Sequence, residues 1–406
     1  MFLTDHYGFE LSTQNAAAAA SYDRAARSFV AWRADAVSHL DSAIEADPEF
    51  AMPKLLKAWI LHAARTHKFA PDIRYLLSSA EQFLPDASSR EQALAASLRT
   101  ANRGNLQGGI SILEIHLADN PRDIVAHRLA QFELFWSGES MWMRDIAERA
   151  APCWTEDAPD FAHFQAVRAF SNEEAGDYDT AERSGRDSVC REPESAWGAH
   201  AVAHTLVMQG RVEEGANFME ALSGNWANAN QIAHHNWWHL CLFLLERAEY
   251  DRILELLDTK VRNPDSPLVK AVPDATIDLQ NVASLLQRLE LRGVDVGDRW
   301  NTISEICAGR ISDHANPFSS AHDAMALAAV GRYDLVESLI ENMQRYGEGH
   351  GVIGAVTRTV GAPVVAAVAA HRQGEHDRVV DLMWPARRDL HQIGGSHAQR
   401  DIFFKF

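Results

Sequence analysis

The sequence has few of the residues that build disulfide frameworks or zinc ribbons. Its four cysteines are far apart and form no CxxC pair: Cys153, Cys190, Cys241 and Cys307. Such a distribution argues against structural disulfides and against a structural zinc site made of thiolates. We therefore expect a protein of the reducing cytoplasm.

Basic residues and long apolar runs are also scarce. Lys and Arg total 38 against 56 Asp and Glu, which gives a formal net charge of −18. An excess of acid disfavours binding to nucleic acid or to anionic lipid. Asp5 and Glu10 occupy the region where a signal peptide would carry basic residues. The longest strongly apolar run is about ten residues, half of what a bilayer requires. We expect neither nucleic acid nor a membrane as a partner.

Several motifs of catalysis and of strand structure are missing as well. The sequence contains no GxSxG, no GxxxxGK[ST] and no HExxH phrase, which removes the usual signatures of serine hydrolases, nucleotide-binding loops and zinc proteases. Hairpin turns of the Asn-Gly or Asp-Gly type between alternating apolar runs are absent too. The sequence therefore points to a helical protein without a common catalytic signature.

Turn residues recur at helical-repeat spacing along most of the chain. Apolar helical patterns stop and restart around eight positions: Gly104, Gly138, Gly176, Gly210, Ala248, Gly293, Gly331 and Gly374. Successive gaps are 34, 38, 34, 38, 45, 38 and 43 residues, a spacing typical of paired helices. A glycine directly after the first helix of a pair suits the left-handed conformation that ends a helix.

This pattern predicts an all-α solenoid of about seven or eight stacked helical hairpins, curved around a concave pocket. We expect one continuous domain over residues 1–406, because each pair would bury its apolar face only against its neighbours. Residues 260–275 contain three prolines and predict a long loop over the groove.

Several phrases of the sequence resemble a known family. "AGDYDTAE" and "QGRVEEG" look like tetratricopeptide repeats. More specifically, "WGAHAVAHTLVMQGRVEEGANFM" and the following "HHNWWHLCLFLLERAEYD" resemble the tetratricopeptide repeat protein 38 family. The resemblance extends over nearly the whole chain. It implies a tetratricopeptide-like solenoid and no particular reaction.

Histidines are concentrated in the expected first helices of the pairs. Seven lie within 13 residues before a turn: His127, His163, His200, His204, His235, His239 and His322. In tetratricopeptide-type arrays these helices line the concave surface, so their side chains would converge. His200 and His204, like His235 and His239, are four residues apart and share one helical face. Trp238 belongs to the opposite, apolar face and is expected in the core.

The leading hypothesis is a cytoplasmic protein that binds a small organic molecule and transforms it by metal-free histidine acid–base chemistry, either hydrolysis or elimination. The candidate catalytic residues are His200, His204, His235, His239, His322 and Asp323. The candidate substrate-binding residues are Trp197, Asn236, Trp237, His397, Arg400 and Asp401, with Arg400 as a carboxylate or phosphate ligand.

Two alternatives belong to other functional classes. In one, the groove binds a peptide of a partner protein without catalysis. In the other, His200, His204, His235 and His239 bind a transition metal, because paired histidines on helices present suitable nitrogens. No cofactor is part of the leading hypothesis. A homodimer is a further expectation, since helical arrays expose apolar edges.

Overall fold

The computed structural model describes residues 3–406, and over these residues the protein is all-α apart from one short ribbon. The ribbon pairs β1 (Leu3–Thr4) with β2 (Glu10–Leu11) in antiparallel register. The predicted helical fold class is confirmed. The contacts divide the chain into two compact units, described separately below. The division passes through α7 (Ile124–Ser137) and α11 (Ala196–Met208), each of which is one continuous helix.

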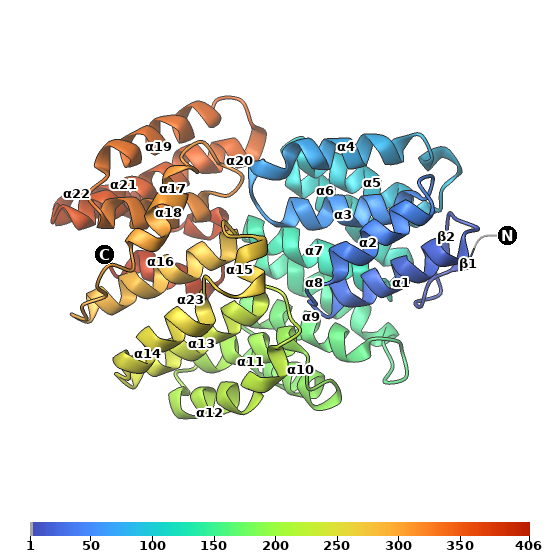
Figure 1. Cartoon of the computed structure of the whole chain (residues 1–406), viewed down its shortest axis with the longest axis horizontal. Coiled ribbons are helices and arrows are strands. Elements are labelled where there is room, and N and C mark those ends of the chain that lie inside the picture. The colour runs from blue at the N-terminus through green and yellow to red at the C-terminus, as the bar shows by residue number, and fades with distance from the viewer. Residues whose placement is uncertain (1–2) are drawn as a thin grey trace. The chain divides into compact units, whose positions relative to one another are not determined.

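The first unit holds the N-terminal helices. They are α1 (Ala16–Val30), α2 (Ala36–Ala46), α3 (Ala51–Ala63), α4 (Ala70–Glu81), α5 (Ser89–Asn102), α6 (Leu106–Asp119), most of α7, α8 (Ser140–Ala150), α9 (Phe161–Glu174), α10 (Tyr178–Arg191) and the first half of α11. Neighbouring helices pack in pairs, α1 with α2, α3 with α4, α5 with α6 and α9 with α10, as Figure 1 shows.

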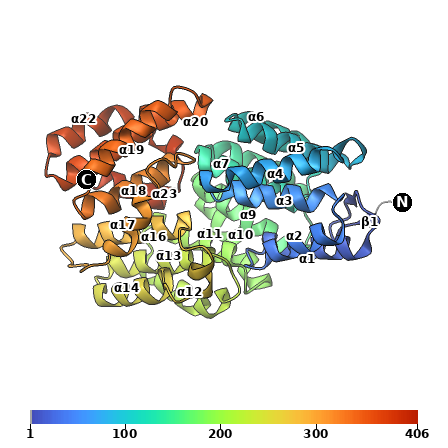
Figure 2. The ribbon, with the colours of Figure 1, turned by 45° about the horizontal axis from the view of Figure 1, so that its top comes forward.

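The second unit holds the remaining helices. They are the second half of α11, α12 (Val212–Leu222), α13 (Ile232–Glu246), α14 (Tyr250–Leu256), α15 (Pro267–Ala271), α16 (Thr276–Leu291), α17 (Asn301–Ala308), α18 (Pro317–Ala329), α19 (Tyr333–Tyr346), α20 (Gly351–Val356), α21 (Ala362–Arg372), α22 (His376–Ala386) and α23 (His397–Arg400). Within it α13 packs against α16 (Figure 2), and α18 packs against α16 and α21.

The predicted turns are confirmed at all eight positions. Each lies between two helices and has a positive φ, from 55° at Ala248 to 86° at Gly104. Glycine reaches this left-handed region without a steric penalty, which explains its use at seven of the eight turns. Ala248 adopts the same conformation with a side chain, so the backbone there is strained.

Two further turns escaped the sequence analysis because they contain no glycine. Trp32, between α1 and α2, has φ 59°, and Arg65, between α3 and α4, has φ 51°. Bulky residues rarely occupy this region unless surrounding contacts hold them there. Both side chains are held by partners in the first unit. Arg65 pairs with buried Glu133 at 2.6 Å, and Trp32 stacks on Trp197 with ring centres 4.6 Å apart.

Two expectations about individual segments need correction. Residues 260–275 are not one long loop, because they contain α15, which begins at Pro267 and is capped by the Ser266 hydroxyl. The helix Gly351–Arg372 has 22 residues and contains an 18-residue window with a mean hydropathy of 1.7, so by length and composition it could cross a membrane, contrary to the estimate from run length. Its apolar window is 56% buried, and α21 packs on α18, α19 and α22, as a core helix does.

Candidate functional site

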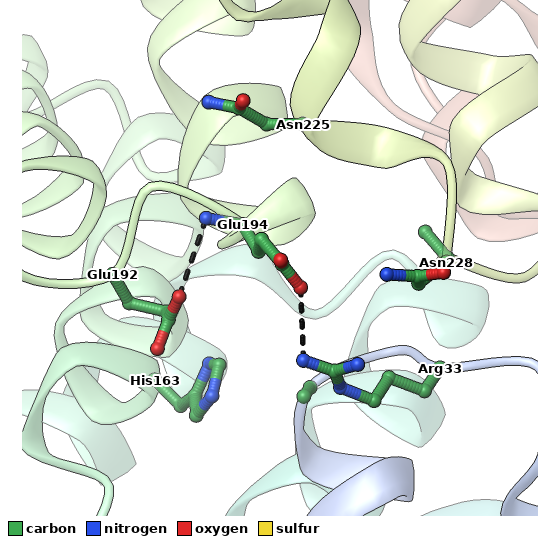
Figure 3. Close-up of a pocket in the computed structure, with 8 residues that line it drawn as sticks. Arg33, His163, Glu192, Glu194, Asn225 and Asn228 are labelled. Carbon is green, nitrogen blue, oxygen red and sulfur yellow. Dashed lines mark hydrogen bonds and ion pairs between the residues drawn. The ribbon is translucent and has the colours of Figure 1, made fainter.

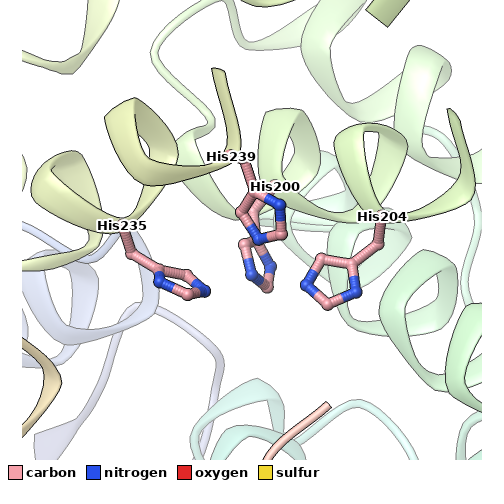
Figure 4. A group of neighbouring side chains, drawn as sticks. All are labelled: His200, His204, His235 and His239. Atoms are coloured by element: carbon pink, nitrogen blue, oxygen red, sulfur yellow. The ribbon is translucent and has the colours of Figure 1, made fainter. Parts of the chain in front are cut away.

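Four histidines of α11 and α13 come together. His200 and His204 lie one turn apart on α11, and His235 and His239 lie one turn apart on α13. One ring nitrogen from each falls within 4.8 Å of the others (Figure 4). Because α11 is continuous, its own backbone places His200 one turn before His204. The predicted convergence of the two histidine pairs is therefore present in the structure.

Within the second unit, three of these rings contact one another directly. The ring centres of His204 and His239 are 4.4 Å apart, and those of His235 and His239 are 4.7 Å apart. Trp238 stacks on His235, with 5.0 Å between ring centres and 9° between ring planes. Trp238 is 1% exposed, as expected for a core residue. It limits the movement of the His235 ring.

A buried amide orients His235. Its Nδ1 lies 2.7 Å from Oδ1 of Asn281 on α16. An amide oxygen only accepts hydrogen bonds, so Nδ1 of His235 carries the proton and donates it. Nε2 is then the nitrogen with a lone pair available to a ligand. Metal-binding histidines commonly have such an outer partner, which fixes the tautomer and the ring orientation. Sequence analysis missed Asn281, because it lies 46 residues after His235.

Burial favours the neutral form of two of these imidazoles, His235 and His239. All four histidines are 0–3% exposed. Removal from water lowers the pKa of His235 to about 3, with the nearby His204 adding to the effect. The pKa of His239 is lowered strongly, first by burial and then by His204 and His235. Neutral imidazole is the form that binds metal ions, whereas an acid–base catalyst needs a pKa near the working pH.

The donor set fits a transition-metal ion. Zinc binds imidazole nitrogen at about 2.0–2.1 Å in tetrahedral sites, which places donor nitrogens about 3.3 Å apart. The four nitrogens already lie within 4.8 Å of one another, so small side-chain rotations would complete such a geometry. Four imidazoles suit zinc, copper, iron or nickel.

The other polar residues of this stretch have different roles. His234 is oriented away from the group and bonds through Nδ1 to Oδ1 of Asp278 at 2.9 Å. Trp237 is only partly buried, and the Lys260 ammonium lies 5.5 Å from its ring centre. Asn236 is fully buried. Trp237 thus belongs to the surface of α13, and His234 is an ion-pairing residue of the core.

Residues His322 and Asp323 lie on α18 and face different partners. Nδ1 of His322 donates to the Phe318 carbonyl at 2.8 Å, and its ring packs on Phe403. The Asp323 carboxylate pairs with Arg310 at 3.2 Å. Burial lowers the pKa of His322 to about 4. Arg288 of α16 is among the charges that lower the pKa of both His322 and His239. The grouping of His322 and Asp323 with the four histidines into one catalytic set stays a prediction.

The C-terminal candidates are also separated from one another. His397 is exposed at the start of α23. Arg400 is buried and donates to the Gly395 carbonyl within its own loop, while Asp401 pairs with Arg288 of α16. Arg400 and Asp401 fasten the C-terminal segment to itself and to α16. The role of His397, Arg400 and Asp401 in substrate binding stays a prediction.

Trp197 on α11 packs inside the first unit. It is 7% exposed, donates from Nε1 to Oε1 of Gln131 at 2.9 Å and stacks on His200, with 4.3 Å between ring centres. It was predicted to bind substrate. The structure shows a buried ring that supports His200.

Comparison with protein-family models found no family that matches the chain. The resemblance to the tetratricopeptide repeat protein 38 family therefore stays a prediction.

Proposed function

We propose that the protein binds a divalent transition-metal ion, with zinc as the first candidate, through His200, His204, His235 and His239. The observation that carries the proposal is the convergence of four buried ring nitrogens within 4.8 Å. The Asn281 partner of His235 supports it, because a proton on Nδ1 places the ring lone pair on Nε2.

All four donors are neutral, so the four imidazoles themselves supply no anion to offset the charge of the ion. Four imidazoles would fill a tetrahedral site, so a bound ion would supply Lewis acidity to a substrate oxygen only in a five-coordinate state. The residues of the chain would hold the ion, fix its position through Trp238 and Asn281, and exclude water by burial.

The metal site is favoured over metal-free acid–base catalysis by the same contacts. His235, with a pKa of about 3, is neutral at physiological pH and carries no proton to donate from Nε2. His322 and Asp323, the other members of the predicted catalytic set, are bonded to Phe318 and Arg310. Metal-free catalysis and peptide binding in a groove both stay predictions without a supporting contact.

We also infer that the helix pairs are tetratricopeptide-like repeats that form a solenoid. The support is the recurrence of one turn geometry, a positive φ after the first helix, at eight consecutive turns. The spacing of 34–45 residues agrees with this class of repeat.

Metal content tests the main proposal. The untagged protein, purified without added metal and without chelator, is analysed by inductively coupled plasma mass spectrometry. We expect close to one transition-metal ion per chain. His235→Ala/His239→Ala is expected to lose it, whereas His322→Ala, which removes a buried histidine outside the group, is expected to retain it.

A second measurement keeps the test valid if the double variant does not fold. Wild-type protein is stripped with a chelator and titrated with Co²⁺, which absorbs visible light strongly when its nitrogen ligands are tetrahedral. Saturation at one equivalent with this spectrum supports the four-histidine site. Absence of metal from the native protein, together with no Co²⁺ spectrum, would refute the proposal.

A further inference from the structure

A second unusual group lies in the first unit, around Arg128 of α7. Its side chain is 2% exposed, and no carboxylate within residues 3–406 forms an ion pair with it. Its Nε is buried without a hydrogen bond. Burial is the sole cause that lowers the pKa of Arg128, and no neighbouring anion counteracts it. Buried arginines normally have an anionic partner, as Arg90 has in Asp123, with 2.6 Å between the atoms.

Aromatic rings surround the guanidinium in place of an anion. The guanidinium carbon lies 4.1 Å from the ring centre of Trp32 and 5.3 Å from those of Phe132 and Trp197, with Phe29 at 5.8 Å. A ring face attracts a cation, but by less than the cost of burying an unpaired charge. The rings accept no conventional hydrogen bond from Nε, which is buried without a partner.

The backbone of the chain is strained at the ring nearest to the cation. Trp32 adopts φ 59°, a conformation that costs a large side chain of order 1–3 kcal/mol. The turn is held there by its neighbours, because the Asn230 amide donates to the Trp32 carbonyl at 2.7 Å. Arg33 also pairs with Glu194 at 2.9 Å. Strain that persists under such restraint is typical of binding sites.

A small cavity borders the same turn. It has a volume of about 30 Å³ and is lined by residues of the first unit alone: Ala31, Arg33, His163, Glu192, Glu194, Asn225, Asn228 and Ala229 (Figure 3). Ala31 and Arg33 flank Trp32, and Arg128 is one of the charges that lower the pKa of His163. Trp32 and Phe132 are only partly buried, so solvent reaches the cage from their side.

We propose that Arg128 is the anchor of a binding site for small organic carboxylates, whose charged group pairs with the guanidinium edge and whose organic part lies against Trp32. Carboxylate is the favoured anion because it is planar and matches the guanidinium fork, which itself lies between ring faces. The aromatic rings favour a ligand with an apolar or aromatic body. The site uses residues outside the four-histidine group and does not depend on a bound metal.

Benzoate is a suitable probe, with acetate and inorganic phosphate as comparisons. Isothermal titration calorimetry is performed on chelator-treated protein and on zinc-loaded protein. We expect benzoate to bind both forms, and more tightly than acetate or phosphate. Arg128→Met is expected to weaken benzoate binding about 10- to 100-fold, the loss of one charge-assisted pair. Arg168→Met removes a partly exposed arginine paired with Glu148 at 2.7 Å and should leave benzoate binding unchanged.

Stability gives a second readout that a purely structural arginine would not produce. Without ligand, Arg128→Met should unfold at higher urea concentration than wild type, because an unpaired buried charge has been removed. With saturating benzoate, only the wild-type midpoint should rise. The proposal is overturned if Arg128→Met binds benzoate as wild type does, if no carboxylate binds, or if the variant is less stable without ligand. Benzoate binding confined to zinc-loaded protein would also overturn it and assign the anion to the metal instead.

Discussion

The buried pair of Glu133 and Arg65 makes a strong prediction about stability and pH. Glu133 on α7 is 1% exposed, and its carboxylate lies 2.6 Å from Arg65 and 3.4 Å from His62. Burial alone would raise the pKa of Glu133, but the charges of Arg65 and His62 outweigh it and lower the pKa to about 2. Glu133→Gln retains the shape of the side chain and removes its charge.

The size of the effect follows from this shift. The usual pKa of 4.5 and the folded value of about 2 differ by about 2.5 units, which is about 3 kcal/mol of unfolding free energy. A depressed carboxylate pKa stabilises the fold above the unfolded pKa, and this stabilisation is lost as pH falls toward the folded pKa. The free energy of unfolding of wild type should therefore exceed that of Glu133→Gln by about 3 kcal/mol at pH 7, and by less than half of that at pH 3.

Urea unfolding, followed by circular dichroism at several pH values between 7 and 3, measures this difference. Glu194→Gln is the matched control, since Glu194 pairs with Arg33 at the surface, where both side chains are more than 40% exposed. Exposed pairs contribute about 0–1 kcal/mol. The two proteins could instead differ in free energy of unfolding by less than about 1 kcal/mol at pH 7, or by an amount that stays constant down to pH 3. Either result would show that the charge of Glu133 does not stabilise the fold through Arg65.

Three further predictions concern turns and thiols. In urea unfolding, Gly138→Ala should destabilise the protein by at least about 2 kcal/mol more than Gly176→Ala. A Cβ at Gly138 would lie 2.2 Å from the His391 carbonyl oxygen, whereas a Cβ at Gly176 would meet no atom within 4 Å. Equal losses of stability in the two variants would contradict this contact. Ala248→Gly should raise stability by about 1 kcal/mol in the same assay, since it relieves a positive φ; a loss would mean that the alanine methyl group has a packing role. In native protein, Ellman's reagent should react with exposed Cys153 but not with Cys241, whose pKa is raised by burial; rapid labelling of Cys241 would show that α13 opens.

The sequence predicted the helix pairs because one local signal, a residue in the left-handed conformation after a helix, recurs at each turn. Where that residue is glycine the signal is readable, as at Gly176 and Gly331. The turns at Trp32 and Arg65 have the same geometry without the glycine. Long-range partners hold them, Trp197 for Trp32 and Glu133 for Arg65, and a local pattern contains no information about such partners.

In the candidate site, too, the sequence predicts what local helical geometry determines and does not predict what depends on long-range partners. The pairing of His235 with His239 on one face follows from helical geometry and was predicted. Their meeting with His204 was expected from the placement of both pairs on first helices, whereas the Asn281 partner of His235 depends on how α13 packs against α16. The sequence gives no indication that Arg128 is unusual, because an arginine on a helix is usually exposed to solvent. Arg128 is unusual because no counter-ion pairs with it among residues 3–406, and only the three-dimensional positions of the surrounding side chains show this.

Trp197 connects the two proposed sites. Its ring stacks on His200 with 4.3 Å between centres, and the guanidinium carbon of Arg128 lies 5.3 Å from the same ring. Because both lie close to the same ring, the guanidinium of Arg128 and the imidazole of His200 cannot be far apart. Arg128 carries its charge until a carboxylate pairs with it, and the chain as a whole carries a net charge of −18, so a positive potential at this arginine would be local to the aromatic rings around it.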